Sequence, residues 1–178
     1  SLASRAMAYP CELTRTEIDA AMSAPHETPA PDASPGRESR FPIELRPALQ
    51  RRAFDDLDTN WRFASPPGVV QFEDRFAGEQ SIDPARTIGD FVVWTKRAQP
   101  AYQLAVVVDD HRQGVTEVVR GDDLLDSAAR QLRLYEALGL APAPRDPHLP
   151  LVVGPDGRRA RRGRASLGGG VRRAAGPR

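Results

Sequence analysis

Between residues 90 and 153 the sequence alternates between strand-like and helix-like segments, and this alternation limits the fold more than any other feature. Residues 90–97 (DFVVWTKR) are rich in β-branched and aromatic residues, which favour a strand. The following segments are predicted in turn as a helix, a buried strand, a helix and a strand: residues 101–114, 115–120, 126–139 and 148–153. Strands that alternate with helices indicate an α/β fold with a doubly wound, mostly parallel sheet.

The segment 101–114 (AYQLAVVVDDHRQG) carries two opposing signals. Its three consecutive valines favour a strand, but Pro100 stands at a helix start and Gly114 at a helix stop. Apolar residues at helical spacing settle the prediction for a helix. The helix predicted over 126–139 is clearer, because Asp126 or Ser127 can cap it and Gly139 can close it.

The first half of the chain is less regular. Residues 11–23 predict a short helix capped by Thr14 or Thr16, and the proline-rich residues 24–39 predict a loop. Residues 40–54 favour a helix after Pro47, and residues 61–82 favour strands separated by turns at 66–68 and at Gly78.

Charge is distributed unevenly along the chain. Eight of the 25 basic residues follow Gly157, where no acidic residue occurs, so residues 1–156 hold 17 basic and 24 acidic residues and a net charge of −7. A basic tail can bind RNA, but this one has almost no apolar residues, which favours a solvated, disordered segment. There is one cysteine, which fits a cytoplasmic protein, and no run of about 18 apolar residues, which indicates no membrane span.

The stretch EVVRGDDLLDS (117–127) places Arg120 at the predicted carboxyl end of a strand, where ligands of such sheets bind. Arginine grips a carboxylate with two parallel hydrogen bonds. The alternatives are structural: Asp122 and Asp123 can simply precede a helix N-terminus, and Arg120 can pair internally with Asp122 or Asp109. The three histidines lack metal-ligand spacing, and no P-loop, GxGxxG or GxSxG motif is present.

The residues 100–140 (PAYQLAVVVDDHRQGVTEVVRGDDLLDSAARQLRLYEALGL) closely resemble the catalytic domain of class I glutamyl-tRNA synthetases. The resemblance is best to the shortened branch of that family, the glutamyl-Q tRNA(Asp) synthetases. It continues through LPLVVGPDGRR (149–159), AYPCELTR (8–15) and SAPH (23–26), and it covers roughly residues 1–160.

This resemblance implies activation of L-glutamate with ATP and magnesium, followed by transfer to queuosine in tRNA(Asp). Tyr102 would contact the bound glutamate, and Arg120 would pair with one of its carboxylates. Asp123 and Leu124 would line the adenylate pocket. Arg162 stands roughly where the family's KMSKS-type lysine belongs, although the only lysine of this chain is Lys96.

The family's zinc site is altered in this sequence. Cys11 stands at one ligand position, but apolar residues stand at what look like the other three: Leu13, Phe41 and Leu45. Replacement of all three indicates a corner packed by apolar side chains, and we expect it to hold no zinc.

The resemblance also implies a division of the chain. Residues 1–88 would form an inserted α+β subdomain, residues 89–160 the second half of a Rossmann-like catalytic domain, and residues 161–178 a disordered basic tail. The family's HIGH-type motif lies in the first half of that domain, so we expect a partial, monomeric form that is inactive alone. Two alternatives remain, namely a truncated glutamyl-tRNA synthetase that charges tRNA(Glu) and a non-catalytic protein that binds an amino acid or RNA.

Overall fold

The computed structural model describes residues 1–22, 40–153 and 172–173. The loop predicted over 24–39 and most of the predicted basic tail lie outside these residues, as does GPDG (154–157), whose sequence predicts a turn. In the described ranges no helix combines the length and the apolar character needed to cross a membrane.

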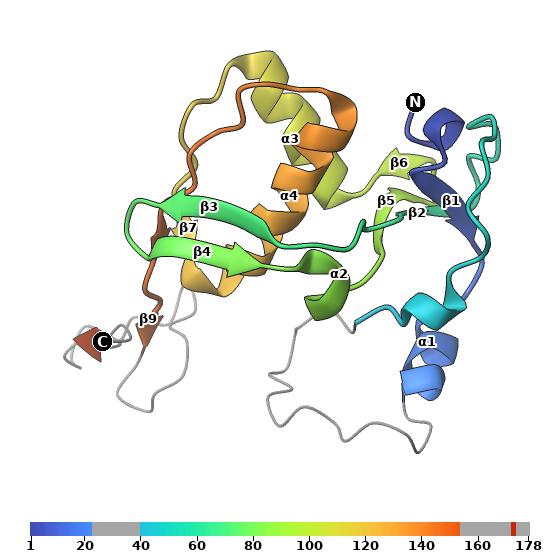
Figure 1. Cartoon of the computed structure of the whole chain (residues 1–178), viewed down its shortest axis with the longest axis horizontal. Coiled ribbons are helices and arrows are strands. Elements are labelled where there is room, and N and C mark those ends of the chain that lie inside the picture. The colour runs from blue at the N-terminus through green and yellow to red at the C-terminus, as the bar shows by residue number, and fades with distance from the viewer. Residues whose placement is uncertain (23–39, 154–171, 174–178) are drawn as a thin grey trace.

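A four-stranded antiparallel sheet forms one side of the molecule (Figure 1). Its strands follow the order β1-β2-β5-β6, with these bounds: β1 Ala8–Cys11, β2 Asn60–Phe63, β5 Phe91–Thr95 and β6 Gln99–Pro100. The strand predicted over 90–97 is therefore confirmed. The sheet takes two strands from each side of the predicted boundary at residue 88, and the division into subdomains stays a prediction.

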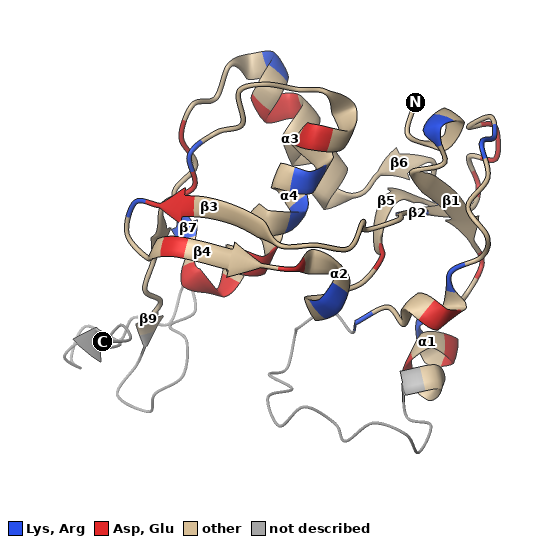
Figure 2. Cartoon of the chain, in the orientation of Figure 1, with Lys and Arg blue, Asp and Glu red and all other residues tan. Residues whose placement is uncertain are grey.

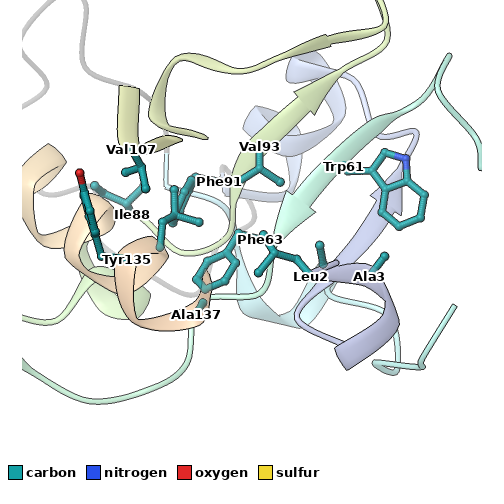
Figure 3. Packing of buried hydrophobic residues seen from close by; sticks show 12 residues of the cluster. Leu2, Ala3, Trp61, Phe63, Ile88, Phe91, Val93, Val107, Tyr135 and Ala137 are labelled. Atoms are coloured by element: carbon teal, nitrogen blue, oxygen red, sulfur yellow. The ribbon is translucent and has the colours of Figure 1, made fainter. Parts of the chain in front are cut away.

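Two helices cover this sheet and close the core (Figure 3). They are α3 (Tyr102–Gln113) and α4 (Leu125–Leu138), which pack against each other, and α3 also contacts β5. Both end at a left-handed glycine, Gly114 with φ +67° and Gly139 with φ +69°, as their sequences predict. The largest side chains of the core come from β2, β5 and α4: Trp61, Phe63, Phe91 and Leu134.

The predicted cap of α4 is wrong. Asp126 and Ser127 lie inside the helix, and the residue at its N-cap is Leu124, which makes no side-chain capping bond. A short 3-10 helix (Asp122–Leu124) runs directly into α4 and takes the place of a capping turn.

A separate hairpin extends away from this sheet, and its first strand contacts α4 (Figure 1). It consists of β3 (Val70–Asp74) and β4 (Gly78–Ile82), as predicted, and the short helix α2 (Pro84–Thr87) follows it. Gly78 has φ +77° at the end of the turn, a conformation that favours glycine.

The buried strand predicted over 115–120 is wrong in its extent and burial. Only β7 (Arg120–Gly121) is a strand; it pairs in parallel with β8 (His148–Leu149), and a further parallel bridge joins Glu117 to Arg145. Val119 is 60% exposed. Within the described residues this segment has a partner on one edge only, so it cannot be buried as a central strand would be. The last strands, β9 (Val152–Val153) and β10 (Arg172–Arg173), form an antiparallel pair.

The helix predicted within 40–54 is also wrong. The structure has a 3-10 turn at Ile43–Leu45, and the chain then runs without regular structure to β2. Phe54 packs edge-on against Trp61 and Trp94, with ring centroids 5.0 and 5.1 Å apart. These aromatic contacts bind the segment to the sheet and outweigh its local helix preference.

The two N-terminal helices are short, and the structure confirms the predicted helix α1 together with its threonine cap. A 3-10 turn spans Ala3–Arg5, and α1 spans Arg15–Met22. The Thr14 backbone N–H donates to Glu17 Oε2 over 2.7 Å, and the Glu17 N–H donates to Thr14 Oγ1 over 3.3 Å. This reciprocal pair is the capping box that the sequence predicts, with Thr14 rather than Thr16 as the cap.

Candidate functional site

Arg120 lies in the parallel strand pair and is almost fully enclosed. Its backbone N–H donates to the carbonyl of Pro147 over 3.1 Å. Its Nη2 lies 3.3 Å from Asp146 Oδ1, and the two side chains are only 7% and 9% exposed. Neither partner considered from the sequence, Asp122 or Asp109, is the one observed. Asp146 was missed because only the pairing of β7 with β8 places it beside Arg120.

Each partner of this ion pair has a buried polar atom that makes no hydrogen bond within the described part of the chain. Among the described residues, neither Asp146 Oδ1 nor Arg120 Nη1 has a hydrogen-bond partner. Burial raises the pKa of the Asp146 carboxyl above its ordinary value, although the Arg120 guanidinium opposes this shift. Arg120 therefore keeps donors with which it could bind the carboxylate of a ligand.

Gly121 gives this strand end its tight packing. A Cβ at this position would lie 2.6 Å from Asp123 Oδ1 and 2.7 Å from Leu151 Cδ2, so any side chain would displace both groups. The φ of Gly121 is −78°, which every residue adopts. The glycine leaves room for these two side-chain ends, and no unusual backbone angle requires it.

The other predicted site residues are spread over several elements. Asp123 is exposed in the 3-10 turn, and Leu124 is half-buried at the N-cap of α4, so both follow closely on Arg120. Tyr102 is the first residue of α3 and is 61% exposed, and no described contact joins it to Arg120. Arg162 lies outside the described residues.

Acidic groups gather around the β7 end of the molecule. Figure 2 shows acidic segments on β3, on β4 and on the turn before α4, around the basic segment of β7. Of the acidic residues in the hairpin, Asp74 is buried, whereas Glu73 and Glu79 are exposed.

The altered zinc corner is packed as predicted. Cys11 is buried in an apolar cluster, and all three replaced positions belong to the same cluster: Leu13, Phe41 and Leu45. Among the described residues no group of three or more histidine, cysteine, aspartate or glutamate side chains could hold a metal ion. Two hollows of about 340 and 560 Å³ lie against this corner, and Arg120 lines neither.

Sequence reasoning missed a buried pair that lies next to Arg120. Asp74, at the end of β3, and His148, the first residue of β8, are both fully buried in their side chains. The Asp74 carboxylate accepts hydrogen bonds from both the backbone and the imidazole of His148. These residues are 74 positions apart, and no local pattern could have indicated the contact.

Comparison with known proteins identifies the family of this chain. Residues 1–161 match the family described as tRNA synthetases class I (E and Q), catalytic domain. A glutamyl-Q tRNA(Asp) synthetase of Rhodopirellula baltica is 46% identical over 161 residues, covering 85% of this chain and 47% of the relative. The protein of that name from Bordetella bronchiseptica is 47% identical over 159 residues, covering 87% of this chain and 46% of the relative.

A solved structure shows the same fold. The crystal structure of a glutamate-tRNA synthetase from Elizabethkingia anophelis aligns with a TM-score of 0.66 and 25% identity, covering 93% of this chain and 34% of that one. The chain spans about half the length of the curated relatives it matches. With the family matched across residues 1–161, the chain belongs to the class I tRNA synthetases (E and Q), within their catalytic domain.

Proposed function

We propose that this chain forms part of a ligase that activates L-glutamate with ATP and transfers it to queuosine of tRNA(Asp). The names of its relatives support this choice of amino acid and tRNA. Because the chain spans about half the length of those relatives, the activity belongs to a protein that also contains the remainder of their sequence.

The proposal depends mainly on the burial of Arg120 and on its unpaired hydrogen-bond donor. Its guanidinium is 7% exposed, and its Nη1 has no hydrogen-bond partner among the described residues. A buried guanidinium with unused donors costs free energy unless something pairs with them. A carboxylate of glutamate has the planar, bidentate geometry to do so.

In the first step, one oxygen of the glutamate α-carboxylate attacks the α-phosphorus of ATP. A new oxygen–phosphorus bond forms as the bond to pyrophosphate breaks, and the electron pair leaves with pyrophosphate. Arg120 holds a glutamate carboxylate, and Tyr102 contacts the amino acid from the start of α3. Asp123 and Leu124 line the adenylate pocket, and Arg162 supplies positive charge. Magnesium, when bound with ATP, would neutralise charge on the phosphates.

The tRNA that accepts glutamate separates this proposal from its nearest alternative. A form extended to the length of the curated relatives should transfer labelled glutamate to tRNA(Asp) that contains queuosine. It should not label tRNA(Asp) that lacks queuosine. Labelling of tRNA(Glu) instead would favour a glutamyl-tRNA synthetase. Glutamate binding without any glutamate-dependent ATP–pyrophosphate exchange would favour a non-catalytic binding protein.

A further inference from the structure

Asp74 lies at the centre of a buried hydrogen-bond network that connects the β3–β4 hairpin to β8. Its Oδ1 accepts from the backbone N–H groups of Phe76 (2.8 Å) and Ala77 (2.7 Å) in the hairpin turn. Its Oδ2 accepts from the backbone N–H of His148 (2.9 Å) and lies 2.6 Å from His148 Nδ1. One carboxylate therefore fixes both its own turn and the first residue of β8.

The ionisation state of Asp74 determines which ring nitrogen of His148 carries the proton. Burial by itself raises the pKa of Asp74, but hydrogen bonds from Ala77, His148 and Phe76 outweigh it and hold the pKa below its usual value. The carboxylate is therefore ionised and can only accept, so the proton lies on His148 Nδ1. The carboxylate thereby fixes the orientation of the imidazole ring.

The segment Asp146–His148 is held by Asp74 on one side and holds Arg120 on the other. His148 is the register partner of Arg120 in the parallel pair. The Pro147 carbonyl accepts from the Arg120 backbone N–H, and the Asp146 carboxylate lies against the Arg120 guanidinium. The Asp146 carbonyl is itself 2.9 Å from His148 Nδ1. Movement of His148 would thus be transmitted to both the backbone and the side chain of Arg120.

We infer that Asp74, through His148, is a positioning residue that sets the orientation of the Arg120 guanidinium for glutamate. This inference rests on the proposed role of Arg120 in binding that substrate. It assigns the β3–β4 hairpin a function, because the hairpin supplies the carboxylate that orients the binding side chain. A 1 Å misplacement of such a group can cost a large part of the activity.

The hydrogen bond between Asp74 and the His148 imidazole can be measured in the 178-residue chain itself. Proton–nitrogen NMR of the imidazoles should show a slowly exchanging Nδ1–H signal from His148 that keeps its chemical shift in Arg120→Lys and moves upfield in Asp74→Asn, because a neutral amide oxygen is a weaker acceptor than a carboxylate. An unchanged signal in Asp74→Asn would show that this hydrogen bond is absent and would overturn the inference.

The effect on substrate binding is measured by glutamate-dependent ATP–pyrophosphate exchange, in a protein extended to the length of the curated relatives. Asp74→Asn should raise the KM for glutamate roughly tenfold or more with the KM for ATP unchanged. Glu73→Gln removes an exposed carboxylate from the same hairpin and should change neither constant. His148→Asn, whose amide can donate near the Nδ1 position, should keep most of the glutamate affinity, whereas His148→Leu should lose it.

The outcomes separate the two proposals. If Asp74→Asn and His148→Leu keep the wild-type KM for glutamate while Arg120→Lys is impaired, the positioning role is wrong and the proposed function stands. If Arg120→Lys is unimpaired, Arg120 does not bind glutamate and the positioning role is wrong with it, whereas the proposed function is overturned only if the extended wild-type protein shows no glutamate-dependent exchange. Circular dichroism verifies that each variant is folded. If Asp74→Asn unfolds, the comparison of His148→Asn with His148→Leu decides the question.

Discussion

Arg46 and Asp90 form a two-pronged ion pair that joins the extended segment after residue 45 to the start of β5. Arg46 Nε donates to Asp90 Oδ2 over 2.7 Å, and Arg46 Nη2 donates to Asp90 Oδ1. The same carboxylate also accepts from the Tyr9 hydroxyl (2.7 Å) and the Ser65 backbone N–H (2.9 Å). The hydrogen bonds to Asp90 raise the pKa of Arg46.

Removal of the Asp90 charge should strongly destabilise the fold. Asp90→Asn leaves the Arg46 guanidinium, which is only 16% exposed, without its counter-ion, so we expect a loss of roughly 3 kcal/mol in the free energy of unfolding. The matched control is Glu117→Gln, which breaks an exposed ion pair with Arg75 and should cost less than about 1 kcal/mol. Urea unfolding followed by circular dichroism measures both, and equal losses would contradict the prediction.

The acid stability of the protein should depend on Asp74 and Asp146 with opposite signs. Hydrogen bonds keep the folded pKa of Asp74 below 3.8, so its contribution is present above that pH and is lost as the pH falls through the folded pKa. Burial raises the folded pKa of Asp146 above 3.8, so the folded state gains stability as the pH falls through that pKa.

The test is urea unfolding of wild type and both asparagine variants between pH 7 and about pH 3. The stability advantage of wild type over Asp74→Asn should shrink at the acid end. The corresponding difference from Asp146→Asn should move in favour of wild type as the pH falls. Slopes of the same sign in both comparisons would show that one of the two assignments is wrong.

Substitution of Arg120 tests the binding role directly. Arg120→Lys keeps the charge but loses the planar fork, and the weakened pairing should cost about 2–5 kcal/mol in glutamate activation. The assay is glutamate-dependent pyrophosphate exchange in the form extended to the length of the relatives. Arg75→Lys, at a side chain that is 56% exposed, serves as the control. An exchange rate within a few-fold of that of wild type would show that Arg120 does not bind glutamate.

The purified chain should contain no stoichiometric zinc. Cys11 is the only thiol, and the three positions that would complete the site are apolar and packed around it. A structural zinc site uses four ligands, and its metal contributes directly to folding. Metal analysis should therefore find far less than one zinc per chain, and a chelator should leave the melting temperature unchanged. About one zinc per chain would mean that other residues supply the ligands.

Local signals in the sequence were sufficient for the elements that depend on local physics. Gly114 and Gly139 end α3 and α4 where predicted, and Thr14 with Glu17 begins α1 as a capping box. The prediction for residues 40–54 was wrong because the segment is held by aromatic contacts with β2 and β5, which no local pattern reveals.

The candidate site divides in the same way. The sequence pointed to Arg120 because of its place at a strand end, and it indicated the apolar corner around Cys11. It could not reveal Asp146, which depends on the parallel register of β7 and β8, or the Asp74–His148 pair, which depends on contact between the end of β3 and β8. The buried strand predicted before Arg120 was wrong for a related reason, because burial of such a strand requires partners on both edges.

The chain alone should not catalyse glutamate-dependent pyrophosphate exchange, even when folded. It spans about half the length of its relatives, and adenylate formation needs several groups placed around the phosphates of ATP at once.

Around β7, Val119 and Leu149 are 60% and 43% exposed, so this side also presents apolar surface to solvent. We expect the short chain to bind a hydrophobic dye there and to show low solubility. The test compares exchange and dye binding for this chain and for the form extended to the length of its relatives. Clear exchange by the short chain would show that the residues assigned to catalysis are incomplete or wrong, because all the groups needed would then lie within these 178 residues.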